Sequence, residues 1–153
     1  MTRINVIDPN DLTDQHLMAE YRELPMIMGS LRRSLKSKRG VDVGSIPSSY
    51  TLNTGHVRHF YNKGKWLQRR YFSLIAELRQ RGYAVDPESR GVDWSVFGEK
   101  LFLDWQPTPR DCVVNLERIL ARVMQKPTFY TLNKKKINVN EYSAQMNASY
   151  CSS

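Results

Sequence analysis

Apolar residues recur at helical spacing in three separate stretches of the chain, and this pattern limits the fold more than any other feature. The first stretch follows an N-cap at Asp11 or Thr13, the second spans about residues 57–81, and the third starts at Thr108 and ends at Pro127. Spacings of three and four residues place such side chains on one face of an α-helix. No stretch alternates convincingly enough to predict a pair of strands. The sequence therefore predicts an all-α fold, a compact single domain of three principal helices joined by long loops.

Each predicted helix carries one apolar stripe that should face the core. The stripes comprise Leu17, Tyr21, Leu24 and Met28 in the first helix, Phe60, Leu67, Tyr71, Leu74, Ile75 and Leu78 in the second, and Val113, Leu116, Leu120, Val123 and Met124 in the third. Basic residues of the second helix, among them Lys63, Arg70 and Arg81, fall largely off its stripe. Pro25 should kink or split the first helix, and Gly82 is a natural C-cap for the second.

The chain is strongly basic, with 23 Lys and Arg against 15 Asp and Glu and a formal net charge of +8. Such an excess favours a polyanionic partner, most commonly nucleic acid; the alternative is a basic protein whose charge only keeps it soluble. No apolar run approaches the roughly 20 residues that span a membrane, and no signal-peptide core is present. We therefore expect an intracellular, cytoplasmic protein. Cys112 and Cys151 lack partners at metal-ligand spacing and are interpreted as reduced thiols.

The first residues of the chain offer an unusual nucleophile. Thr2 is a small residue, so Met1 is expected to be removed and Thr2 to carry the free α-amine. An α-amine has an ordinary pKa of about 7.7–8.0, so it is substantially neutral and nucleophilic near physiological pH. Arg3 follows it, and the first predicted helix carries Arg22 and Glu23. An amine, a carboxylate and arginines suit imine chemistry on an anionic substrate, although a helix with Glu and Arg is more often an ordinary solvated face.

Specific motifs occur in a fixed order over roughly residues 1–130. They are Met1-Thr2-Arg3-Ile4-Asn5, the run from Asp14 to Pro25, Gly55-His56-Val57, Phe60-Tyr61, Leu74-Ile75-Ala76-Glu77 with Arg81-Gly82, and Gln125-Lys126-Pro127-Thr128 followed by Phe129 and Tyr130. In these motifs the chain resembles the phage pyrimidine-dimer DNA glycosylase/lyase family, the family of phage endonuclease V. The first two motifs are the most specific of the set.

The resemblance implies a set of site residues and a threaded chain start. In the family's architecture, the N-terminal segment passes between the first and third helices, where Ile4 and Val6 would anchor it by burial. The matching positions are Thr2 for the nucleophile, Glu23 for the essential carboxylate, Arg3, Gln15, His16 and Arg22 for the lesion pocket, and Arg118 and Arg122 for the phosphates near the lesion.

The resemblance also implies a reaction and a partner. A monomer from a phage or a bacterium would bind double-stranded DNA that contains ultraviolet photoproducts. Its N-terminal amine would form a Schiff base with the sugar as the glycosidic bond of a pyrimidine dimer breaks, and β-elimination would then nick the strand. This chemistry needs no metal and no other cofactor.

Two departures from the family pattern leave the lesion open. Met26 stands where the compared family member has Arg, and the run from Phe129 to Lys134 replaces a C-terminal cluster that is richer in aromatic residues. The same chemistry on another damaged base or an abasic site is therefore an alternative, as is a DNA-binding protein without catalysis. After a glycosylase-like domain over residues 1–138, the polar residues 139–153 are expected to form a disordered tail.

Overall fold

The computed structural model describes residues 3–151 of the chain. Its α-helices are α1 (Asp14–Glu23), α2 (Pro25–Lys36), α3 (His56–His59), α4 (Gly64–Gln80), α5 (Gly98–Leu101), α6 (Pro109–Gln125) and α7 (Val139–Tyr150). Short 3₁₀ helices cover Pro9–Asp11, Val43–Ser45, Pro87–Arg90 and Trp94–Phe97, and the strands β1 (Thr131–Leu132) and β2 (Lys135–Lys136) form a small antiparallel hairpin. The predicted all-α class is confirmed, and the hairpin is the one pairing of strands in the described residues. None of the helices in residues 3–151 has the length and apolar character needed to cross a bilayer.

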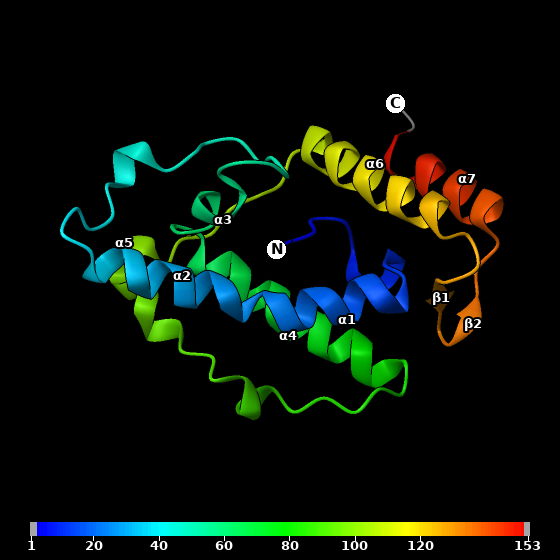
Figure 1. The fold of residues 1–153 in the computed structure, drawn as a ribbon, viewed down its shortest axis with the longest axis horizontal. Coiled ribbons are helices and arrows are strands. Elements are labelled where there is room, and N and C mark those ends of the chain that lie inside the picture. Colours follow the sequence, from blue (N-terminus) through cyan, green and yellow to red (C-terminus); the bar gives the residue numbers. More distant parts are fainter. Residues whose placement is uncertain (1–2, 152–153) are drawn as a thin grey trace.

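Helices α1 and α2 lie end to end, α1 packs on α4, and α6 lies on the other side of the N-terminal segment (Figure 1). Thr13 begins α1, because its hydroxyl accepts a hydrogen bond from the backbone N–H of His16. Pro25 splits the first predicted helix, so that α1 ends at Glu23 and α2 begins at the proline. The apolar face of α1 is buried against α4, whereas that of α2 is buried against α3 and the 3₁₀ helix Trp94–Phe97.

The second predicted helix is broken in the structure, where a turn over residues 60–63 separates α3 from α4. Gly64 begins α4 at a close approach, since a Cβ there would lie 2.6 Å from Cγ of Phe97. The expectation that Lys63, Arg70 and Arg81 lie off the buried face is wrong, because all three are at most 7% exposed. Each of them has polar partners in the core, which sequence periodicity does not reveal.

Helix α6 begins as predicted, with a capping box between Thr108 and Asp111. Its buried face differs by one position from the predicted stripe, because Ile119 is buried and Met124 is 64% exposed. Met124 follows the buried Val123 directly, so the helix turns it about 100° away from that face.

The C-terminal segment differs from the expected disordered tail. Residues 139–150 form helix α7, which Asn138 caps and which packs on α6. Tyr142 and Met146 lie one helical turn apart, are 4% exposed and belong to the same hydrophobic core as Leu116 of α6. Two apolar contacts one turn apart are too weak a periodic signal to predict a helix in an otherwise polar stretch.

Candidate active site

The N-terminal segment, residues 3–12, runs between α1 on one side and α6 on the other (Figure 1). Ile4 and Val6 are buried, which confirms that both residues anchor the segment. Residues 3–7 belong to no helix or strand, so their backbone groups need other partners.

Side chains from three helices and a loop supply those partners. The backbone N–H of Ile4 donates to Nε2 of His56 at 2.8 Å, and its carbonyl accepts from the hydroxyl of Tyr50 at 2.7 Å. Oδ1 of Asn115 accepts from the backbone N–H groups of both Val6 and Ile7, at 2.7 and 3.1 Å. Arg70 then donates to the carbonyl of residue 7 at 2.6 Å. These hydrogen bonds therefore hold the segment in one conformation in the core, although it has no regular secondary structure.

His56 is a neutral imidazole in this arrangement. Its Nδ1 lies 2.7 Å from the carbonyl oxygen of Thr51, which only accepts, so Nδ1 carries the proton. Nε2 therefore presents its lone pair to the N–H of Ile4. Burial lowers the pKa of His56 to about 4, and the positive charge of Arg3 acts in the same direction. A proton on Nε2 would face the Ile4 N–H and remove this anchor.

The free energy of unfolding should therefore fall in mild acid. Between pH 6.5 and about 4 the unfolded chain holds a proton on His56 that the folded chain lacks. The stabilising contribution is complete above pH 6.5, is lost as the pH falls towards 4, and amounts to about 3 kcal/mol for this group. Denaturant unfolding from pH 4 to 8 measures it, and His56→Gln, which keeps an acceptor near Ile4, should flatten the slope in that interval. An equal slope in the two proteins would contradict this assignment.

A buried polar cluster lies directly behind the chain start. Glu20 and Arg70 form a two-point ion pair, with Nε to Oε2 at 2.8 Å and Nη2 to Oε1 at 2.9 Å, and their side chains are 0% and 6% exposed. Nδ2 of Asn5 also donates to Oε1 of Glu20 at 2.9 Å, and Oδ1 of Asn5 accepts from Nδ2 of Asn115 at 2.7 Å. The side chain of Asn5 thus joins α1 to α6 across the N-terminal segment.

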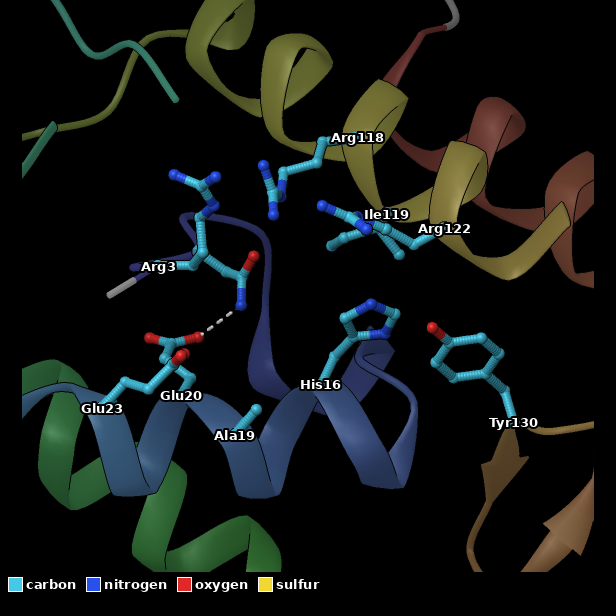
Figure 2. A pocket seen from close by; sticks show the side chains of 10 residues that line it. Arg3, His16, Ala19, Glu20, Glu23, Arg118, Ile119, Arg122 and Tyr130 are labelled. Carbon is cyan, nitrogen blue, oxygen red and sulfur yellow. Dashed lines mark hydrogen bonds between the residues drawn. The ribbon is translucent and has the colours of Figure 1, made fainter. Parts of the chain in front are cut away.

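A cavity of about 410 Å³ opens between α1 and α6, directly beside this segment. Figure 2 shows its lining side chains converging from α1, α6, the N-terminal segment and the residue before β1. The lining residues are Arg3, Asn5, His16, Ala19, Glu20, Glu23, Arg118, Ile119, Arg122 and Tyr130. The structure therefore brings five of the predicted site residues, Arg3, His16, Glu23, Arg118 and Arg122, around one hollow.

Glu23 is a half-buried carboxylate on the wall that α1 forms. Burial raises its pKa, and a backbone hydrogen bond from Arg3 together with the charge of that residue opposes the rise only in part. A raised pKa brings a carboxylate nearer to neutral pH, where a general base is most effective. In the predicted scheme, the nucleophile is on the residue that precedes Arg3 in the chain. That residue, Thr2, lies outside the described residues.

His16 and Tyr130 form the aromatic end of the cavity (Figure 2). Their rings stack with centroids 5.0 Å apart and an interplanar angle of 1°. Nδ1 of His16 lies 2.7 Å from the Thr13 hydroxyl, which fixes the ring from the N-cap of α1. Burial lowers the pKa of His16 to about 4, and the charges of Arg118 and Arg122 add to this effect. A neutral imidazole stacked on a phenol offers a flat, uncharged wall at this end.

Three guanidinium groups, those of Arg3, Arg118 and Arg122, line the side of the cavity that faces α1 (Figure 2). Burial lowers the pKa of Arg118, and the neighbouring charges of Arg3 and Arg122 lower it further. Crowded like charges of this kind favour the binding of an anion between them. The cavity thus combines a carboxylate, an aromatic wall and a cationic rim.

The other two predicted pocket residues lie in an adjoining hollow of about 420 Å³. Gln15 exchanges two hydrogen bonds with Thr131, from its Nε2 to the hydroxyl at 3.1 Å and from the Thr131 N–H to its Oε1 at 2.9 Å. Arg22 is exposed on the same side of α1. Ala19 lines both hollows, so they meet along α1.

A family model described as pyrimidine dimer DNA glycosylase matches residues 1–90, which include the N-terminal segment, α1 and α4. The chain belongs to this family. Its general activity is accordingly that of a pyrimidine-dimer DNA glycosylase, and its substrate is DNA. The matched region contains the carboxylate side of the cavity, whereas α6 supplies most of the cationic rim from beyond it.

Sequence reasoning missed four residues that hold this glycosylase's candidate site together, namely Asn5, Glu20, Arg70 and Asn115. Glu20 and Arg70 looked like ordinary charged positions on helices, and their pairing joins residues 50 positions apart. Asn115 carried one usable signal, because it is a polar residue beside the apolar positions of a predicted core stripe. Among residues 3–151 no three His, Cys, Asp or Glu side chains gather as metal ligands do, and the absence of a metal requirement stays a prediction.

Proposed function

We propose that the chain is a DNA glycosylase with abasic-site lyase activity, which removes ultraviolet-induced pyrimidine dimers through an imine on its N-terminal amine. The observation that carries the proposal is the position of Arg3 and the half-buried carboxylate of Glu23 on the wall of one cavity, which Arg118 and Arg122 also line. The chain start and an acid of raised pKa thus share a hollow that also has a cationic rim.

In the proposed reaction, the α-amine of Thr2 attacks C1′ of the damaged nucleotide. The electron pair of the glycosidic bond leaves with the base, and the attacking amine loses one of its two protons. The bond from C1′ to the ring oxygen O4′ then breaks, O4′ takes up a proton, and the nitrogen and C1′ form a protonated imine. Glu23 then accepts the proton from C2′, and the electrons of that bond expel the 3′ phosphate by β-elimination. Water hydrolyses the imine and returns the amine, so one nucleophile serves both steps.

The remaining cavity groups have matching tasks in this scheme. Arg118 and Arg122 bind the phosphates that flank the lesion, and the negative charge of the DNA relieves the crowding of their guanidinium groups. Arg3, His16, Gln15 and Arg22 contact the lesion and its neighbour across the two adjoining hollows. The duplex must be kinked or a base extruded for an amine at a protein surface to reach a sugar.

Borohydride trapping tests the proposal. The protein is incubated with a duplex that holds a single pyrimidine dimer, without added metal, and borohydride reduces the imine to a stable covalent adduct. We expect one adduct per chain with wild-type protein and none after selective acetylation of the α-amine. An adduct that persists after acetylation would assign the nucleophile to a lysine, and salt-dependent binding without any adduct or nick would overturn the proposal.

The same assay tests the proposed lesion. Parallel duplexes carry a dimer, an oxidised pyrimidine or an abasic site at one position. We expect trapping on the dimer and on the abasic site, because the second mimics the product of the first step. If more adduct forms on the oxidised pyrimidine than on the dimer, the proposed substrate is wrong, but the proposed imine chemistry still holds.

A further inference from the structure

Helix α7 contacts the N-terminal segment through the hydroxyl groups of two tyrosines. The backbone N–H of Asp8 donates to the hydroxyl of Tyr150 at 3.0 Å, and this hydroxyl in turn donates to the carboxylate of Asp11. The hydroxyl of Tyr142 donates to the backbone carbonyl of Asp11 at 2.7 Å. The pairs are 131 to 142 residues apart in sequence, so the last helix holds the first turn of the chain.

These contacts continue the row of side-chain bonds that begins at Ile4. Asn115 of α6 holds the N–H groups of residues 6 and 7, Tyr150 holds the next N–H at Asp8, and Tyr142 holds the carbonyl at Asp11. Helix α7 packs on α6, so the two helices that carry Asn115, Tyr142 and Tyr150 are in contact with each other. Figure 2 shows α7 behind α6 as seen from the cavity, and no described residue of α7 lines that cavity.

We propose that α7 is a positioning element for the reactive chain end, in which Tyr150 and Tyr142 set how far the N-terminal segment reaches into the cavity. The proposal rests on the proposed function, in which the α-amine of Thr2 is the nucleophile. A slip of the segment by one residue would move its end by about 3.3 Å. A misplacement of about 1 Å already costs up to 100-fold in rate. The tyrosine hydroxyls are therefore expected to act on the rate of imine formation and not on DNA affinity.

Tyr150→Phe and Tyr142→Phe remove only the hydroxyl groups. The matched control is Tyr61→Phe. The Tyr61 phenol is buried like that of Tyr142, but its hydroxyl bonds to Ser30 at 2.6 Å and Ser34 at 3.2 Å, both in α2, and not to residues 3–12. In the single-turnover trapping assay we expect the two α7 variants to form the imine on the order of ten-fold more slowly than wild type. The dissociation constant for DNA should stay within two-fold, roughly the margin for a residue outside the interface.

Two further measurements separate positioning from a general loss of stability. Amide hydrogen exchange of residues 6–8, measured without DNA, should accelerate in Tyr150→Phe and not in Tyr61→Phe. Asp11→Ala removes the carboxylate that accepts the hydrogen bond from the Tyr150 hydroxyl. Because both changes break the same bond, the double variant with Tyr150→Phe should form the imine no more slowly than the slower of the two single variants. This second variant keeps the test valid if one tyrosine variant does not fold.

Unchanged exchange at residues 6–8 together with an unchanged trapping rate in both α7 variants would overturn the proposal. So would a rate loss of equal size in Tyr61→Phe, because that result would reflect stability alone. The exchange measurement does not depend on catalysis. If wild-type protein forms no adduct at all, the proposed function fails, while accelerated exchange would still establish that α7 holds the segment.

Discussion

Glu23→Gln should bind dimer-containing DNA as wild type does and incise it on the order of 10²–10⁴-fold more slowly, the range that a positioned general base contributes. Gln keeps the shape of the side chain and an oxygen that accepts the hydrogen bond from the backbone of Arg3. It cannot accept the C2′ proton, and it lacks the charge that stabilises a cationic sugar. Single-turnover incision measures the rate, and a gel-shift titration measures binding.

Glu88→Gln is the matched control for this variant. Glu88 is an exposed carboxylate that lines neither of the two hollows along α1, so its removal should change neither binding nor rate. Incision by Glu23→Gln at more than a tenth of the wild-type rate would show that another group takes the proton. In that case the raised pKa of Glu23 would be a consequence of its burial alone.

Much of the fold follows from local sequence rules. The N-cap at Thr13, the split at Pro25 and the helix start at Thr108 are each determined by a few neighbouring residues. The sequence predicts the start at Thr108 directly, narrows the first N-cap to Asp11 or Thr13, and predicts either a kink or a split at Pro25. Helix α7 depends on contacts with α6 and with residues 8–11, which lie more than 130 positions away. Local periodicity carries no information about such contacts, so the tail was predicted to be disordered.

The candidate site divides in the same way. His16, Glu23, Arg118 and Arg122 could be placed on faces of predicted helices and were matched one by one. The groups that hold the chain start are buried polar residues whose partners are distant in sequence, such as Glu20 with Arg70. A buried charge is stable only with its partner, and the partner is visible only in three dimensions.

Arg70→Met should lower the free energy of unfolding by about 3–5 kcal/mol, because it leaves the carboxylate of Glu20 buried without its cation. It also removes the donor to the carbonyl of Ile7. Denaturant unfolding at pH 7 measures the change. The control is Arg69→Met, the adjacent arginine on α4, whose side chain is 56% exposed and pairs with Asp104 at the surface. Loss of such a surface pair should cost about 1 kcal/mol or less.

The double variant Arg70→Met with Glu20→Leu separates the two tasks of this ion pair. Stability should recover by several kcal/mol relative to Arg70→Met, roughly what an apolar replacement of both charges returns. The rate of imine formation should not recover, because Asn5 has lost its acceptor on α1 and the carbonyl of Ile7 its donor on α4. Recovery of both quantities would mean that the pair serves folding alone. Recovery of stability without rate would mean that the buried charges are retained because they fix where the chain begins.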